Sequence, residues 1–343
     1  MAKVLFVATS PKTRGGISAV IHHYQSNALW NDYHCIWIGN HIDRGAAWKI
    51  YYFLKGLARY IYYLPGADIV HFHFSNPIRE LFFLFPAKLL NKKIISHFHA
   101  NSVEETLDSR KKRLYQYFFR KSNCILVLSE YWEKQVRKLV NDSKRVEILY
   151  NPCSKVSSSS VTRKEKTVLF AGTLIHRKGY ETLIRAFAKA HPDCPDWNLE
   201  LAGNGEIEKA RSISEELGIA SHVIFLGWIS GNKKHDTFDK ASVFCLPSYA
   251  EGFPMAVLDA FSYGLPVITT PVGGIPDVAE DGENMLLFQP GDIDQLSALI
   301  IRITSDEALR DRLSKASLRL AEEVFSVDTV CKKLRAIYDS LLT

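Results

Sequence analysis

The sequence has few cysteines and no long apolar run, which excludes several classes of protein. Its 343 residues include six scattered cysteines, with no CxxC pair and no histidine at the spacing of a zinc site. The first residues, MAKVLFVATSPKTRGG, contain an apolar run of only five or six residues that ends in proline and charge. Such a run is too short for a signal peptide or a membrane span. We therefore expect reduced thiols, a cytoplasmic location and a buried first strand.

Acidic residues are scarce in the first half of the chain. Residues 1–155 hold 23 Lys or Arg against 11 Asp or Glu, a net charge of +12, whereas the remainder holds 20 against 26, a net charge of −6. Hydrophobic residues make up 47% of the chain, which is typical of a globular protein. The basic half suits phosphates, nucleic acid or an anionic membrane surface, and charge alone does not choose among them.

Short β-rich apolar runs alternate with longer helical patterns in both halves, which predicts two α/β domains with parallel sheets. The stretch 153–166 is Ser-rich and charged and predicts a linker. The expected domains are therefore 1–155 and 156–326, followed by a C-terminal helix at 327–343. The expected strands are KVLFVAT, YHCIWIG, DIVHFHF, KIISHFH, CILVLS and VEILYN in the first domain, and TVLFAG, NLELAG, HVIFLG, VFCLP and PVITTP in the second.

The stretch from Ser248 to Val278 joins a strand end to a Gly-Pro loop and a helix that begins near Pro254. Proline suits a first helical turn, and the unpaired amides there form an anion site that would fit a diphosphate. Glu251 precedes this helix and Asp259 lies within it, eight residues later, or roughly 12 Å along a helix. One carboxylate could reach a sugar and the other a ribose. A capping glutamate and a surface aspartate are the structural alternative.

This stretch resembles the donor site of retaining GT-B glycosyltransferases of family 4, in which seven residues separate two glutamates. The resemblance implies that Glu251 is a catalytic contact to the donor sugar. It implies that Asp259, where the family has glutamate, holds the ribose hydroxyls, and it places Gly252, Phe253 and Met255 in the donor site. The implied fold is α/β, with two Rossmann-like domains facing each other across a cleft and a C-terminal helix that crosses back to the first domain.

A second stretch, VLFAGTLIHRKGYETLIRAFAKA, also resembles the family, because a glycine loop with two cations lies between a strand and a helix. In the family this loop neutralises the donor phosphates. Lys178 matches the phosphate-binding lysine, which implies a catalytic contact. The family often has arginine after the glycine equivalent to Gly172, where this chain has Thr173. We therefore expect Arg177 or a residue of the first domain to supply the second positive charge.

Other glycine loops resemble family segments that approach the nucleotide or the sugar. LAGNGEIE carries Gly203 and Asn204, which would permit a close backbone approach to the nucleotide, although an ordinary strand-to-helix turn is equally compatible. Trp228 either stacks on the base or packs partly buried. SPKTRGGIS, after the first strand, carries Gly15 and Gly16, whose amides would approach the donor or the acceptor.

Two histidines in KIISHFHANS, His97 and His99, lie on one face of a strand end. In the family a histidine of this region lies near the transferred sugar, which implies His99 as a catalytic contact. A structural role for His97 is as compatible with the sequence as a functional one.

The DID motif at Asp292 to Asp294 matches the DxD pattern that binds a metal in another glycosyltransferase architecture. Here it follows QPG and opens a helix, so capping explains it better. We expect no metal, and no cofactor besides the nucleotide sugar as co-substrate.

The stretch DRGAAWKIYYFLKGLARYIYYLPG, from Asp43, mixes aromatic and basic residues over about five helical turns, and four cations at Arg110 to Arg113 precede LYQYFFRKS. Aromatic and basic residues on one helix suit a membrane interface, and could bring the protein to a lipid-linked acceptor at an anionic surface. Internal charge argues against spanning. A buried aromatic helix with solvated lysines is the alternative. No recognised motif supports nucleic-acid binding.

Together these features predict a metal-independent transferase that moves a hexosyl or related sugar from a UDP- or GDP-linked donor to a saccharide or lipid-linked saccharide. The resemblance implies retention of anomeric configuration and a role in cell-surface polysaccharide synthesis. A sugar-nucleotide epimerase of GT-B type and a catalytically idle nucleotide-sugar-binding subunit are the two alternatives.

Overall fold

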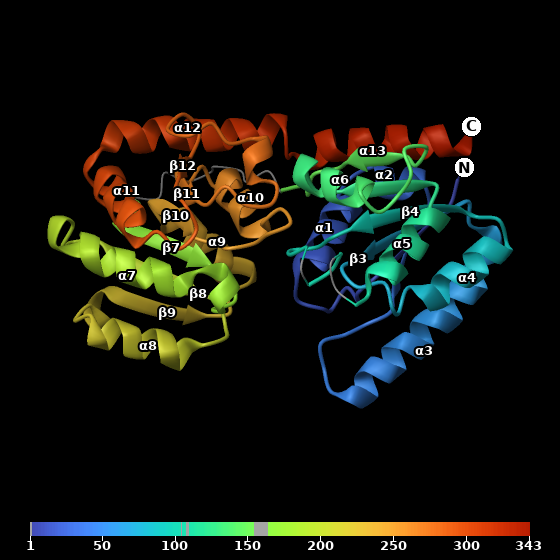
Figure 1. Ribbon diagram of the computed structural model, residues 1–343, viewed down its shortest axis with the longest axis horizontal. Helices are drawn as coiled ribbons and strands as arrows, with labels where there is room; N and C mark the ends of the chain where they lie inside the picture. The colour runs from blue at the N-terminus through green and yellow to red at the C-terminus, as the bar shows by residue number, and fades with distance from the viewer. Residues whose placement is uncertain (1, 104, 108–109, 154–163) are drawn as a thin grey trace. The chain divides into compact units, whose positions relative to one another are not determined.

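The computed structural model describes the chain except for residues 1, 104, 108–109 and 154–163 (Figure 1). Most of the expected linker therefore lies outside the described residues. The chain divides into two compact units, of which the first is Met1–Pro152 with Ser326–Thr343 and the second is Cys153–Phe325. The C-terminal segment returns to the first unit, which confirms the predicted crossing.

The first unit contains a six-stranded parallel sheet in the order β2-β1-β3-β4-β5-β6. Alternation along each strand sends successive side chains to opposite faces. Leu5 and Val7 of β1 therefore join the hydrophobic core on one face of the sheet, whereas Phe6 contacts Tyr24 and Trp30 on the other. The strands are β1 Val4–Ala8, β2 Ile36–Gly39, β3 Ile69–Phe74, β4 Lys93–Phe98, β5 Cys124–Val127 and β6 Val146–Ile148.

Helices cover both faces of this sheet. One face is covered by α1 and α13, because Tyr24 and Tyr338 both approach histidines of β3. The other is covered by α3, α4, α5 and α6, which supply Tyr60, Phe83 and Trp132 among other core residues. The helices are α1 Gly16–Gln25, α2 Leu29–Asp32, α3 Ala46–Tyr63, α4 Leu81–Leu89, α5 Lys112–Lys121, α6 Glu130–Arg137 and α13 Val327–Leu342.

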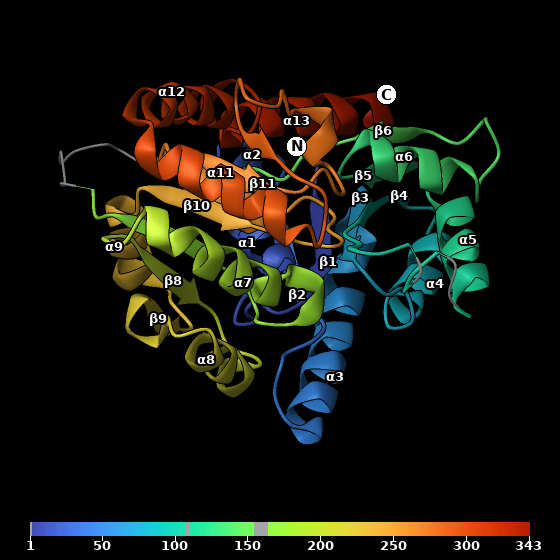
Figure 2. The same cartoon turned by 60° about the vertical axis from the view of Figure 1, so that its left-hand side comes forward.

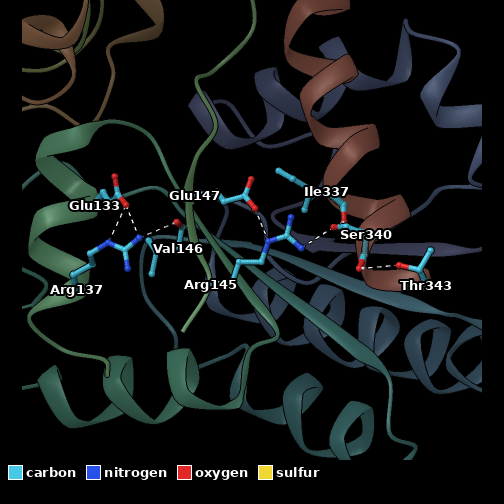
Figure 3. A network of polar contacts seen from close by, with 8 residues as sticks. All are labelled: Glu133, Arg137, Arg145, Val146, Glu147, Ile337, Ser340 and Thr343. Atoms are coloured by element: carbon cyan, nitrogen blue, oxygen red, sulfur yellow. Dashed lines mark hydrogen bonds and ion pairs between the residues drawn. The ribbon is translucent and has the colours of Figure 1, made fainter. Parts of the chain in front are cut away.

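Polar contacts fasten α13 to the edge of this unit (Figure 3). Arg145, just before β6, pairs with Glu147 and donates a hydrogen bond to Ser340 Oγ of α13 at 2.6 Å. Ser326 caps the start of α13 by accepting from the Thr329 amide. The helix thus belongs to the first unit by polar contacts as well as by its buried apolar side.

The second unit contains another six-stranded parallel sheet, in the order β12-β11-β10-β7-β8-β9. The chain starts this sheet at β7, builds outward to β9, and returns to the other side of β7 with β10 (Figure 1). Ligands of such sheets bind outside the carboxyl ends of the strands where the order reverses. The loops after β7 and β10 therefore occupy the expected position of a site.

Strands and helices alternate along most of the second unit, as they do in the first. The strands are β7 Thr167–Ala171, β8 Asn198–Ala202, β9 Val223–Gly227, β10 Val243–Leu246, β11 Val267–Thr269 and β12 Leu286–Leu287, and the helices are α7 Tyr180–Ala190, α8 Ile207–Glu216, α9 Gly231–Lys240, α10 Met255–Ser262, α11 Ile293–Ser305 and α12 Glu307–Glu323.

The structure confirms the predicted α/β class, and each of the eleven expected strand runs contains a strand. The two-residue β12 was not predicted, because so short a strand has no period to detect. Asp292 caps α11 by accepting from the Gln295 amide, as expected of the DID motif. Among the described helices, none combines the length and the apolar character needed to cross a bilayer.

Candidate active site

The loops after β7 and β10 are joined backbone to backbone. The Tyr249 amide donates to the Arg177 carbonyl at 2.8 Å. Gly179 has a φ of +71°, and a Cβ at this position would lie 1.9 Å from the Pro247 carbonyl oxygen. Only glycine combines this conformation with so close an approach. The two loops are therefore held in one fixed arrangement at the reversal of strand order.

Glu251 lies at the centre of this arrangement with 4% of its side chain exposed. Its Oε1 accepts hydrogen bonds from Lys178 Nζ at 2.5 Å and from Ser248 Oγ at 2.8 Å. Arg177 Nη1 lies 3.5 Å from Oε2 and donates to the Ala250 carbonyl at 2.7 Å. One buried carboxylate thus has two cationic neighbours, which leaves a net charge of +1 among the three side chains. Such a group suits an anionic ligand.

Two glycines that the sequence interpretation did not single out, Gly273 and Gly274, lie in close contact with the Glu251 loop. A Cβ on Gly273 would lie 2.3 Å from the Glu251 carbonyl oxygen, and one on Gly274 would lie 2.2 Å from the Phe253 ring. The Gly274 amide also donates to the Gly252 carbonyl at 2.8 Å. In the sequence, the glycine pair in PVGG could have indicated these close approaches. Ser248 carried no sequence signal for its contact with Glu251 beyond its position at a strand end. Met255, the first residue of α10, follows this loop.

Comparison with known proteins finds family models that match both halves of the chain. Residues 155–319 match the model of "Glycosyl transferases group 1", and residues 16–154 match "Glycosyltransferase Family 4". The chain belongs to the group 1 glycosyltransferases. The chain has the two-domain GT-B fold, and its structure matches a crystal structure of Anabaena HepE in complex with UDP-glucose. That match has a TM-score of 0.82 at 18% identity and covers 99% of this chain and 100% of the other.

Curated relatives of this glycosyltransferase match over shorter lengths. An uncharacterized glycosyltransferase of Methanocaldococcus jannaschii is 26% identical over 67% of this chain and 64% of the relative. The lipopolysaccharide core biosynthesis glycosyltransferase LpsE of Rhizobium meliloti is 26% identical over 58% of each. The chain thus spans less than two thirds of the length of both relatives.

The loop after β8, which is expected to approach the nucleotide, packs against the loop after β7, which is expected to bind the donor phosphates. The Gly172 amide donates to the Ala202 carbonyl at 2.8 Å, and a Cβ on Gly203 would lie 1.8 Å from the Gly172 carbonyl oxygen. Gly203 is therefore required for the contact between the two loops. Thr173 and Asn204 are both exposed beside this contact.

Asp259, the expected ribose contact, lies in α10 and forms an ion pair with a residue that the sequence interpretation did not name. Its Oδ2 lies 2.7 Å from Lys234 Nζ of α9. The sequence alone offered no signal, because α9 and α10 are separated by β10. Trp228, after β9, is exposed rather than buried.

The expected glycine loop of the first unit follows β1. Gly15 precedes α1 with a φ of +152°, and a Cβ there would meet no atom within 4 Å. Gly16 begins the helix. The open space beside Gly15 leaves room for a ligand to approach the backbone at the start of α1.

His99 belongs to a layer of four buried histidines, of which the sequence interpretation named two. His73 Nδ1 lies 2.9 Å from His99 Nε2, and the rings of His97 and His99 are 4.3 Å apart. His71 Nδ1 lies 2.7 Å from the Tyr338 hydroxyl of α13. The DIVHFHF run carried the signal for the other two, because His71 and His73 share one face of β3.

Burial keeps these imidazoles neutral. It lowers the pKa of His99 to about 3 and holds the pKa values of His71, His73 and His97 well below the usual range, with further lowering from neighbouring histidines. A neutral imidazole offers one donor and one acceptor nitrogen to a hydroxyl group. Ligand atoms of His71, His73 and His97 also lie within 4.8 Å of one another, a group that could hold a metal ion. The expected independence from metal stays a prediction.

Proposed function

We propose that the chain transfers a hexosyl or related sugar from a UDP- or GDP-linked donor to a saccharide or lipid-linked saccharide acceptor. The observation that carries this proposal is the buried Glu251 carboxylate between Lys178 and Arg177, at the strand-order reversal of the second unit. The Anabaena neighbour solved with UDP-glucose supports a nucleotide-sugar donor. The lipopolysaccharide core biosynthesis relative supports a role in cell-surface polysaccharide synthesis.

In this proposal the site acts by charge. Lys178 and Arg177 offset the negative charge of the donor diphosphate, and this effect grows as the bond between the anomeric carbon and the diphosphate breaks. Glu251 accepts hydrogen bonds from hydroxyls of the donor sugar. Asp259, which forms an ion pair with Lys234, holds the ribose hydroxyls. His99 contacts the transferred sugar through its neutral imidazole.

Retention of configuration is part of the proposal. The acceptor hydroxyl forms its bond to the anomeric carbon on the face from which the nucleotide diphosphate leaves with its electron pair. The hydroxyl proton passes to the departing phosphate oxygen, which is the base nearest to it. The positive charges of Lys178 and Arg177 stabilise the leaving nucleotide diphosphate without a metal ion.

The test begins with a thermal-shift screen of UDP, GDP, ADP and their sugars, followed by transfer assays with the donor that stabilises the protein. We expect Lys178→Ala and Glu251→Ala each to lower kcat/KM at least tenfold, roughly 1.4 kcal/mol of transition-state stabilisation. Product NMR should show a retained anomeric configuration, and chelation with EDTA should leave turnover unchanged.

The matched control is Lys189→Ala, which removes a lysine from α7 that pairs with Asp294 on an exposed surface. This variant should keep wild-type turnover. Unchanged turnover in both site variants would overturn the site assignment. Release of a rearranged sugar without acceptor would identify an epimerase, and tight nucleotide-sugar binding without turnover of any donor would identify an idle binding subunit.

A further inference from the structure

Exposed apolar side chains of the described residues gather on α3 and α4. Nineteen large hydrophobic side chains of the described residues are exposed, and twelve of these belong to the segment from Trp48 to Tyr117. Scattered single residues of this kind are normal on a protein surface, whereas a concentration of them marks an interaction site. We call the following group the α3–α4 face: Trp48, Tyr51, Leu54, Ile61, Tyr62, Phe82, Phe85 and Leu89.

Both helices expose large apolar side chains as well as burying others. In α4, Phe83 and Leu84 are buried in the core, whereas Phe85 and Leu89 are 71% and 75% exposed. In α3, Tyr60 is buried and Tyr62 is 79% exposed. A surface helix normally presents polar residues to water, and a helix as hydrophobic on all sides as α4 needs a second apolar cover.

The exposed apolar side chains of α3 and α4 form one surface. The Phe53 ring of α3 lies 5.4 Å from the ring of Phe82 and 5.9 Å from that of Phe83. Both views show α3 and α4 side by side in the first unit (Figures 1 and 2). On its inner side α3 presses against β2, because a Cβ on Gly56 would lie 2.6 Å from the Gly39 carbonyl oxygen. On the outer side of α3, Trp48 and Tyr62 are exposed.

Positive charge surrounds this apolar surface. The helices α3, α4 and α5, all of whose residues are described, contain eight Lys or Arg and no Asp or Glu. Lys55 lies 5.6 Å from the Tyr51 ring and Arg44 lies 5.5 Å from the Trp48 ring. Long basic side chains at the edge of an apolar surface can extend their charged ends to lipid headgroups.

One face of α5 is basic. It presents Arg113, Gln116, Tyr117, Arg120 and Lys121, of which all but Gln116 are exposed. Further cations lie close together near the ends of α4 and α5. Partial burial and then the charges of Lys88 and Lys121 lower the pKa of Lys144. This crowding favours an anion at the surface over another cation.

We propose that the α3–α4 face and the cations of α5 bind the interface of an anionic phospholipid bilayer. The apolar residues enter the boundary between headgroups and acyl chains, and Arg113, Arg120 and Lys121 bind lipid phosphates. The absence of a spanning helix among the described residues fits a protein that lies on the membrane. A bilayer accounts for both features, because it offers an apolar layer beneath a negatively charged one. The proposal does not depend on sugar transfer, because its test measures binding alone.

The test is flotation of the full chain with vesicles of phosphatidylcholine alone and of phosphatidylcholine with phosphatidylglycerol. We expect at least tenfold stronger binding to the anionic vesicles, weakened by added salt. The double variants F85S/L89S and R120E/K121E should each reduce that binding at least tenfold, because they remove apolar insertion and phosphate contacts respectively. All four positions are exposed, so folding should be unchanged, which circular dichroism and thermal unfolding would verify.

Two control variants separate this surface from general effects. K332E/K333E makes the same change in net charge on exposed positions of α13, and Ile224→Ser removes an exposed apolar side chain from β9. Both should bind vesicles like the wild type. Equal loss in K332E/K333E and R120E/K121E would overturn the assignment of α5. Absence of binding to the anionic vesicles would overturn the proposal. A dimer that F85S/L89S dissociates would then identify a second copy of the chain as the partner of this surface.

Discussion

A carboxylate as deeply buried as that of Glu251 requires positive or hydrogen-bonding partners, because burial of an unpaired charge is costly. Lys178 and Arg177 supply positive charge and Ser248 supplies a hydrogen bond, although the two cations lie more than 70 residues away in sequence. The sequence motifs indicated the residue types, and the strand order explains why they meet. Asp259 shows the limit of such motifs, since its partner Lys234 lies in a different motif-free helix.

The close approach at Gly179 gives a prediction at this scale. Gly179→Ala should lower the free energy of unfolding by at least about 2 kcal/mol and weaken nucleotide binding, because its Cβ would overlap the Pro247 carbonyl and separate the two loops. Urea unfolding and calorimetric titration with the nucleotide would measure the two effects.

Gly218→Ala is the matched control for that variant. Gly218 has nearly the same φ, +72°, but a Cβ there would meet no atom within 4 Å. It should therefore show the smaller penalty of an unfavourable φ, about 1 kcal/mol, and normal nucleotide affinity. Similar losses in both variants would contradict the role assigned to the contact with Pro247.

At the scale of elements, the histidine layer shows how strand register places side chains together. His73 of β3 lies directly opposite His97 of β4, and period-two alternation adds His71 and His99 to the same face. The alternation of each strand was visible in the sequence. The pairing of β3 with β4 was not, because the sequence does not state which strands are neighbours.

This layer makes stability depend on pH. Burial lowers the histidine pKa values in the folded state, so below about pH 6.5 the unfolded chain takes up protons that the folded chain does not. Stability should therefore be greatest above pH 6.5 and fall as the pH decreases. The expected loss at pH 5 is roughly 2 kcal/mol for each such histidine, measured by urea unfolding at pH 7 and pH 5.

A variant with one fewer histidine checks this interpretation. His97→Leu leaves three histidines in the layer and should reduce the loss between pH 7 and pH 5 by about 2 kcal/mol, whatever its stability at pH 7. An unchanged loss would show that other groups govern the acid sensitivity.

At the scale of the whole molecule, the chain begins and ends in the same unit. Val327–Leu342 forms α13, which buries Leu334, Ile337 and Tyr338 in the first unit, together with Val330 and Leu341. Each such side chain contributes about 1.5 to 3 kcal/mol on burial, so the helix represents a large part of the stability of an ordinary domain.

Deletion of residues 326–343 should therefore unfold the first unit and leave the second folded. Hydrogen exchange measured by mass spectrometry should show lost protection in β1 and β3 and retained protection in β7 and β10. The double variant Lys332→Ala and Lys333→Ala, at exposed positions of α13, should keep full protection. Retained protection of β3 in the truncated chain would contradict an essential role for α13.

The sequence by itself determined the two α/β units, the positions of their strands, the C-terminal helix and the motifs around Lys178 and Glu251. These features depend on local periodicity and on short motifs, which neighbouring residues in the chain carry. Only the tertiary structure decided that Ser248 and Arg177 share the Glu251 carboxylate, that Lys234 pairs with Asp259, and that Phe82, Phe85 and Leu89 extend the aromatic surface of α3. The physical reason is that strand order and helix packing bring together residues that are distant in sequence.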